Sequence, residues 1–254
     1  MKDKKMNTPN PDDIAHELGL RAEEFKYDWS LKARENQRPP QGDWRVWLIL
    51  AGRGFGKTRM GAETIRAFAQ SGLYGRIALV GETEHDVRSV MIEGESGLLN
   101  ISPPSFRPEL QISLKRLVWP NGVMAEFFSA QNPEGLRGPQ FHGAWVDELA
   151  KYKDPEEVYN QLNFTLRLGP SPKMIITTTP KPIKLIQDLT QESYVTLTRG
   201  STFDNAKNLS PSFLAHVTKL YGGSDLGAQE LEGQIIHEAR LFQENDFRYG
   251  LPGG

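Results

Sequence analysis

The sequence predicts an α/β domain in which helices cover both faces of a mostly parallel β-sheet, so that the domain has three layers. The main observation is that short apolar runs of strand length alternate with longer segments that carry apolar residues at helical spacing. A second observation is the turn sequence Pro120-Asn121-Gly122 between two alternating stretches, which indicates an antiparallel hairpin inserted into the sheet.

The apolar runs and the amphipathic segments define the expected elements. Near-continuous apolar runs are typical of parallel strands that are buried on both faces. These runs place strands at 44–50, 76–81, 141–146, 174–178 and 194–198, and the two arms of the hairpin within 109–129. The helical patterns lie at 57–70, 84–91, 155–166, 183–189, 211–221 and 225–232, with one or two further helices between 11 and 33.

Composition excludes several classes of protein. The chain has 254 residues and no cysteine, which excludes disulfide frameworks, cysteine-ligated zinc and thiol nucleophiles and is consistent with a reducing cytoplasm. Residues 1–13 lack the apolar segment of a secretory signal, and the longest apolar run, 46–51, is too short to span a membrane. The formal net charge is only −2, so any contact with DNA is expected to be local or shared among several subunits.

The strongest functional signal is the segment 51–58, Ala-Gly-Arg-Gly-Phe-Gly-Lys-Thr, which follows an expected strand and opens an expected helix. Glycines allow positive φ and turn backbone N–H groups inward around an anion, and the helix N-terminus adds partial positive charge. The alternative is a glycine-rich turn that happens to contain a lysine. The residues expected to contact phosphate are Gly52, Arg53, Gly54, Gly56, Lys57 and Thr58.

This segment has the pattern of a P-loop, which predicts ATP and Mg²⁺ as cofactors. Lys57 is expected to reach the β- and γ-phosphates, and the Thr58 hydroxyl is expected to ligate Mg²⁺. Ala51 stands where the general pattern has its first glycine. Alanine is the smallest replacement and is tolerated there if its φ is negative.

Asp147 and Glu148 follow the apolar run 141–146 and supply the acids that a P-loop needs. Asp147 is expected to hold Mg²⁺ through water, and Glu148 to orient and deprotonate the attacking water. An Asp-Glu pair by itself is more often a solvated helix start. Behind an apolar strand, in a chain with a phosphate loop, it predicts ATP hydrolysis by a P-loop NTPase domain of the ASCE type.

Two further features have an open interpretation. Thr177, Thr178 and Thr179 end the strand at 174–178 and either sense the γ-phosphate or simply form a polar strand end before Pro180. Arg137 lies in a loop with glycines on either side. It either neutralises charge on the transferred phosphoryl group or is an ordinary loop arginine.

At this point the residues resemble a known family. The segment 36–58, Asn-Gln-Arg-Pro-Pro-Gln-Gly-Asp-Trp followed by a strand and the phosphate loop, looks like the opening of the large terminase subunit. Large terminases are the DNA-packaging motors of tailed bacteriophages and gene transfer agents. Further matches follow in the family's order: Glu-Gly-Leu-Arg-Gly-Pro-Gln-Phe (134–141), Ala-Trp-Val-Asp-Glu-Leu-Ala (144–150), Thr-Thr-Thr-Pro (177–180), Thr-Phe-Asp-Asn (202–205) and Gln-Glu-Leu-Glu-Gly (229–233).

The resemblance implies a role for each matched position. Gln37 is similar to the family's adenine-recognising glutamine, and Arg53 to the arginine of the loop. Arg137 matches the arginine that is proposed in some members to reach into the neighbouring subunit's site. The remaining matches imply phosphate binding and catalysis by Lys57 and Glu148, metal binding by Thr58 and Asp147, and coupling of hydrolysis to movement by Thr177, Thr178 and Thr179.

The resemblance also implies an assembly. The family works as a ring, typically of five subunits, that docks on the portal protein, cooperates with the small terminase subunit and moves double-stranded DNA into a procapsid in the cytoplasm of the bacterial host. Whether the isolated chain is a ring or a monomer stays open. Ala228 departs from the family, in which many members have arginine at this position.

The expected division of the chain is a tail and helix at 1–28, the ATPase domain at 29–242, and a linker at 243–254 toward a nuclease domain that the chain does not include. Two alternatives remain at this stage. One is a helicase-like DNA-dependent ATPase, which would need a second motor domain although only 74 residues follow Pro180. The other is a module that binds nucleotide or DNA without turnover.

Overall fold

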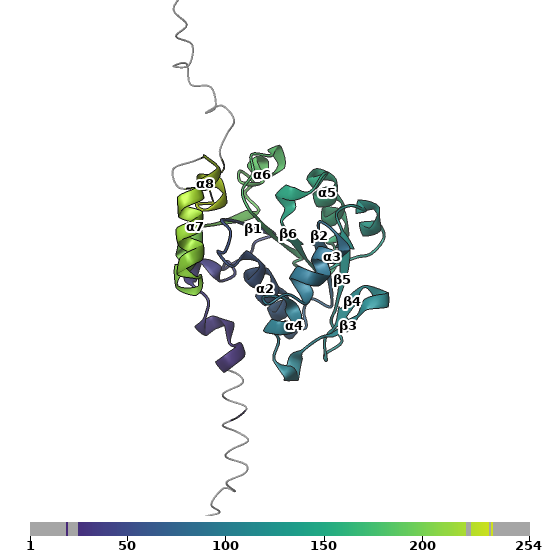
Figure 1. Cartoon of the computed structure of the whole chain (residues 1–254). Helices are drawn as coiled ribbons and strands as arrows, with labels where there is room; N and C mark the ends of the chain where they lie inside the picture. Colours follow the sequence, from purple (N-terminus) through teal and green to yellow (C-terminus); the bar gives the residue numbers. More distant parts are fainter. Residues whose placement is uncertain (1–18, 20–24, 222–224, 234, 236–254) are drawn as a thin grey trace, which may run out of the picture.

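The computed structural model of this chain describes residues 19, 25–221, 225–233 and 235 (Figure 1). Within these residues, one sheet contains eight strands in the order β3-β4-β5-β2-β6-β7-β1-β8. Every neighbouring pair from β5 to β8 is parallel, whereas β4 is antiparallel to both β3 and β5. The strands are β1 (Val46–Ala51), β2 (Arg76–Gly81), β3 (Glu109–Gln111), β4 (Arg116–Val118), β5 (Met124–Ser129), β6 (Gly143–Asp147), β7 (Lys173–Thr178) and β8 (Val195–Gly200).

Helices cover both faces of the sheet, which confirms the expected three-layer α/β class (Figure 1). The α-helices are α2 (Lys57–Ser71), α3 (Glu84–Asp86), α4 (Leu98–Ile101), α5 (Pro155–Thr165), α6 (Lys184–Leu189), α7 (Pro211–Tyr221) and α8 (Asp225–Glu230). The shorter turns are η1 (Trp29–Leu31), η2 (Glu35–Gln37), η3 (Val87–Ile92), η4 (Pro104–Phe106), η5 (Ile112–Leu114), η6 (Pro133–Leu136), η7 (Leu149–Lys151) and η8 (Thr202–Asn208).

Strand β1 shows why the apolar runs are continuous. All six of its residues are buried. Trp47 and Ile49 belong to the core beneath α2, whereas Leu48 and Leu50 belong to the core on the other face, beneath α5 and α6. Because successive side chains point to opposite faces, a strand with both faces covered needs apolar residues at every position.

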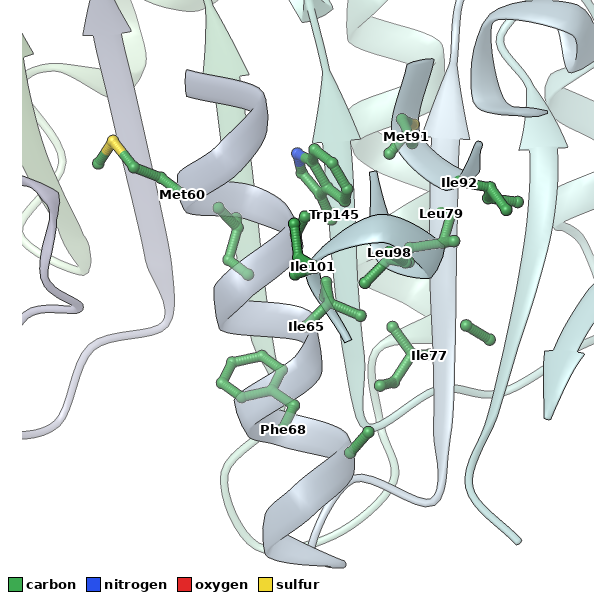
Figure 2. Close-up of a cluster of buried hydrophobic side chains, with 14 of the residues drawn as sticks. Met60, Ile65, Phe68, Ile77, Leu79, Met91, Ile92, Leu98, Ile101 and Trp145 are labelled. Atoms are coloured by element: carbon green, nitrogen blue, oxygen red, sulfur yellow. The ribbon is translucent and has the colours of Figure 1, made fainter. Parts of the chain in front are cut away.

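The core beneath α2 packs around Trp145 of β6 (Figure 2). Ile65 and Phe68 of α2 enter this core together with Leu79 of β2. Gly61 of α2 lies directly against the indole, because a Cβ at this position would collide with the ring. The helix that follows the phosphate loop is therefore packed closely against the strand that ends in Asp147.

Two expected elements differ from the structure. The hairpin around 120–122 is present, but β5 pairs in parallel with β2, so the hairpin extends the main sheet instead of forming a separate insertion. The expected helix at 84–91 continues after α3 as the π-helix η3. The wider π turn lets Val87, Met91 and Ile92 all face the core, where each is buried.

Other boundaries shift by only one or two residues, as is usual at element ends. Much of the expected tail (1–28), most of the helical region before residue 33 and the expected linker (243–254) lie outside the described residues. Within the part of the chain that the structure describes, no helix is long and apolar enough to cross a membrane.

The carboxyl ends of β6, β7 and β1 lie side by side. Strand β7 pairs with β6 on one side and with β1 on the other, and Thr177 is in register with both Asp147 and Ile49. The segments that leave these three strands therefore meet at one edge of the sheet. In open α/β sheets this edge is where ligands bind.

Candidate active site

The phosphate loop has the backbone geometry that its glycines predict. Gly54 has φ 73° and Gly56, the N-cap of α2, has φ 105°. Both values lie in the left-handed region that side chains disfavour. Gly52 is needed for a different reason, because a Cβ there would collide with the carbonyl oxygen of Leu231. Ala51 belongs to β1 and has no positive φ, which is why alanine is tolerated at this position.

Lys57, the first residue of α2, points into the loop. Its buried ammonium group donates to the carbonyl oxygens of Ala51 (2.9 Å) and Gly52 (3.2 Å) and to the Thr179 hydroxyl (3.1 Å). It also lies 3.6 Å from Glu148 Oε1. Burial lowers the pKa of Lys57, and the two neighbouring acids oppose that shift.

Asp147 ends β6 and is buried. Burial raises the pKa of its carboxyl to about 6, and the adjacent charge of Glu148 adds to this shift. The Thr177 hydroxyl donates to Asp147 Oδ1 at 2.6 Å, while Trp145 Nε1 donates to the same hydroxyl at 2.8 Å. Since an indole N–H can only donate, this arrangement directs the hydroxyl proton of Thr177 toward the carboxylate.

Glu148 has a backbone conformation that is unusual for its residue type. Its φ is 58°, a left-handed value that costs energy outside glycine and is often found at functional sites. Its N–H donates to the Thr177 carbonyl at 2.5 Å, and its Oε2 accepts from the Thr179 N–H at 3.2 Å. Lys151 lies 3.7 Å from Oε2. The surrounding bonds therefore hold the carboxylate beside Lys57.

A cavity of about 190 Å³ lies at this edge of the sheet and is lined by Thr58, Asp147, Glu148 and Lys151, together with residues of β2, the loop after it, α3 and η3. A hydroxyl and a carboxylate oxygen are the ligands that Mg²⁺ prefers beside phosphate groups, so Thr58 and Asp147 fit a magnesium ion here. A larger cavity, of about 900 Å³, lies between residues 27–30, α2 and η4, and no residue of the phosphate loop lines it.

The structure does not bring every expected residue to this cavity. Arg137 is exposed, and its guanidinium pairs with Glu134 (2.8 Å) and Glu157 (3.6 Å). The Arg53 side chain is exposed on the loop. Gln37 is buried against the loop, where its Nε2 donates to the Phe55 carbonyl at 3.3 Å.

The sequence analysis missed three residues that contact these elements. Lys151 carries no motif of its own, although it follows Glu148 by three residues. Trp145 reads as an ordinary apolar position of β6, and its bond to Thr177 depends on the pairing of two strands. Arg34 donates to the Phe55 carbonyl at 2.6 Å, and nothing in the sequence around it indicates this contact.

A glycine-rich loop between a parallel strand and a helix, a lysine at the start of that helix and two acids at the end of a nearby strand define a P-loop NTPase domain. The model of one protein family matches residues 48–248, and its description is terminase large subunit, T4likevirus-type, N-terminal. The chain therefore belongs to the terminase large subunit family. It is an ATPase domain of the kind that packages viral DNA.

Solved structures share the fold at low sequence identity. The large terminase ATPase domain of Thermus phage P74-26 is similar with a TM-score of 0.58 and 16% identity over 77% of this chain and 90% of that chain. The large terminase of another thermophilic bacteriophage, in complex with ADP, gives 0.63 and 16% over 88% and 56%. The bacteriophage HK97 large terminase gives 0.55 and 14% over 83% and 50%. Among curated proteins none matches this chain.

Proposed function

We propose that this chain binds ATP with Mg²⁺ at the carboxyl end of β1 and hydrolyses it to drive double-stranded DNA into a procapsid. One observation carries the catalytic part of the proposal. The Lys57 ammonium contacts groups from all three converging segments: Ala51 at the end of β1, Glu148 after β6 and Thr179 after β7. A large terminase of the same fold, from a thermophilic bacteriophage, was solved with ADP.

In the proposed reaction, Lys57 exchanges its bonds to loop carbonyls for bonds to the β- and γ-phosphates. Glu148 accepts a proton from a water molecule while the water oxygen attacks the γ-phosphorus. The bond between that phosphorus and the bridging oxygen breaks, so that ADP and phosphate are formed. Thr58 and Asp147 would hold Mg²⁺, which neutralises charge on the phosphate oxygens when bound. Thr178 and Thr179 would report loss of the γ-phosphate through β7.

Two residues of the proposed site act at its periphery. Gln37 would select adenine, and its burial against the loop at Phe55 supports a place beside the nucleotide. Arg137 would act on the site of a neighbouring subunit. Its exposed guanidinium, paired with Glu134 and Glu157 instead of the phosphate loop of its own chain, supports action between subunits. Arg53, exposed on the loop, would contact phosphate.

The proposed setting is the cytoplasm of a bacterial host. There the chain would form a ring on the portal protein, together with the small terminase subunit. The net charge of −2 supports DNA contact that is shared among subunits. The family match favours this function over a helicase-like motor. The ATPase domain would extend over 29–242, between the tail and the linker.

Phosphate release and ADP binding by the Lys57→Ala variant test the proposed site. Both should be lost or strongly weakened, because the variant lacks the charge that meets the phosphates. Lys184→Ala is the matched control, since the Lys184 side chain is 81% exposed on α6. The assay is run at high protein concentration, where subunits can meet. Hydrolysis by Lys57→Ala at the rate of the control would contradict the proposal.

A further inference from the structure

Three consecutive carbonyl groups on the outer side of the phosphate loop each accept a hydrogen bond from a side chain outside the loop. Two donors come from η8 and one comes from the residue before η2. The bonds run from Thr202 Oγ1 to the Arg53 carbonyl (2.6 Å), from Asn205 Nδ2 to the Gly54 carbonyl (2.6 Å) and from Arg34 Nη2 to the Phe55 carbonyl (2.6 Å).

These donors also bind one another. Arg34 Nη1 donates to Asn205 Oδ1 at 2.6 Å, so the Asn205 amide receives a bond from Arg34 and gives one to Gly54. The Arg34 guanidinium also lies over the Phe55 ring, 4.9 Å from its centroid. The three donors, Arg34, Thr202 and Asn205, form one connected unit, which we call the carbonyl clamp.

The carbonyl clamp is anchored to the segment after α8. The Thr202 N–H donates to the Leu231 carbonyl at 2.7 Å, and that same carbonyl lies against the Cα of Gly52. Thr202 is fully buried. The two sequence motifs at 202–205 and 229–233, which have no part in the proposed chemistry, therefore meet on the outer side of the phosphate loop.

Peptide geometry explains what the clamp does. In a planar trans peptide the carbonyl and the N–H point in opposite directions. A carbonyl of Arg53 held outward turns the Gly54 N–H inward, and a carbonyl of Phe55 held outward does the same for the Gly56 N–H. A loop rich in glycine would otherwise lose considerable conformational entropy when it orders around an anion.

We propose that Arg34, Thr202 and Asn205 are positioning residues that hold the phosphate loop in its anion-binding conformation before a ligand arrives. This inference rests on the proposed function, because it takes the loop to be the phosphate site. The clamp acts on N–H groups that face phosphate. Its removal should therefore weaken binding of ADP and of inorganic pyrophosphate by the same factor.

Thr202→Val and Asn205→Ala each remove one donor, and each should weaken both ligands about threefold to tenfold. Thr202→Ser keeps the hydroxyl and should restore wild-type affinity. Asn208→Ala is the control on η8, because Asn208 bonds to Asn205 Oδ1 and not to the loop. Asn205→Asp keeps the acceptor for Arg34 but loses the donor to Gly54, so it should behave like Asn205→Ala.

Hydrogen exchange of the peptide 52–58 in the unliganded protein tests the clamp independently of nucleotide binding. Exchange should be faster in Thr202→Val and Asn205→Asp than in Asn208→Ala, with melting temperatures close to wild type. Unchanged exchange in both variants would overturn the clamp, and so would wild-type affinity for pyrophosphate. If the wild type bound neither ADP nor pyrophosphate, the proposed function would fail, while the exchange result would still decide the conformational role.

Discussion

The buried carboxyl of Asp147 sets a local conflict between stability and function. Its pKa is raised to about 6, first by burial and then by the charge of Glu148, and the bond from Thr177 opposes the shift. In an unfolded chain an aspartate titrates near about 4. The folded protein therefore binds the proton more tightly than the unfolded chain. The ionised group begins to destabilise the fold as the pH rises past 4, and the effect is complete above pH 6.

Asp147→Asn should stabilise the unliganded protein at pH 8, because it removes the buried charge and keeps an oxygen for Thr177. A shift from 3.8 to about 6 corresponds to at most roughly 3 kcal/mol. Denaturant unfolding in a chelator measures the gain, which should shrink to nothing as the pH falls from 6 to below 4. Asp188→Asn on α6 is the exposed control. A gain of the same size at every pH would refute the assignment.

The sequence analysis anticipated which residues gather at the site better than their conformations. The spacing around Lys57, Asp147 and Glu148 indicates loops that follow parallel strands, and such loops meet because strand polarity forces them together. The left-handed backbone of Glu148 has no sequence signal, because it depends on tertiary bonds to Thr177 and Thr179. The donors of Arg34 and Asn205 to the loop were missed for the same reason.

At the scale of elements, α2 and β6 are coupled through one close contact. Gly61 on α2 leaves room for the Trp145 indole, and the same indole donates to Thr177 of β7. The helix of the phosphate loop, the strand of the carboxylates and the strand of the threonines therefore share one buried side chain. A displacement of any of them has to be accommodated at Trp145.

Gly61→Ala should destabilise the protein by about 1–3 kcal/mol, although alanine favours a helix, because the new methyl group collides with the indole. Urea unfolding gives the value. Trp145→Leu frees the space, so the double variant should lose less stability than the sum of the two single losses. Strict additivity would show that Gly61 and Trp145 do not constrain each other.

Elements with long, regular patterns were predicted well, and those defined by their partners were not. The expected helices 211–221 and 155–166 lie within one residue of α7 and α5. Strand β5 was expected in an isolated hairpin, because its alternating pattern gives no sign that it also pairs with β2. The π-helix η3 could not be expected from spacing alone, since one buried face fits either an α or a π turn.

For the whole molecule, the position of Arg137 implies that a single copy is incomplete. The guanidinium lies on the exposed turn η6 and pairs with two surface acids, so the site of its own chain lacks this charge. An arginine that reaches the transition state accelerates phosphoryl transfer by about 10³–10⁵ in other systems. The isolated chain should be a slow ATPase whose specific rate increases with protein concentration.

Mixing two inactive variants, Arg137→Ala and Glu148→Gln, tests whether Arg137 acts between subunits. Some interfaces in the mixture would pair an intact Glu148 site with an intact Arg137 donor, so part of the activity should return. Each variant alone at the same total concentration is the control. Absence of any recovery, together with a specific rate that is independent of concentration, would place Arg137 outside the neighbouring subunit's site.

The central claim is that Glu148 accepts the proton of the attacking water, and Glu148→Gln tests it most directly. Glutamine keeps the size of the side chain and an oxygen for the Thr179 N–H, but its amide is not a base. ATP binding and phosphate release are measured on the same assembled sample. We expect binding close to that of wild type and hydrolysis slower by about 10²–10⁴. Hydrolysis by Glu148→Gln near the wild-type rate would contradict the account.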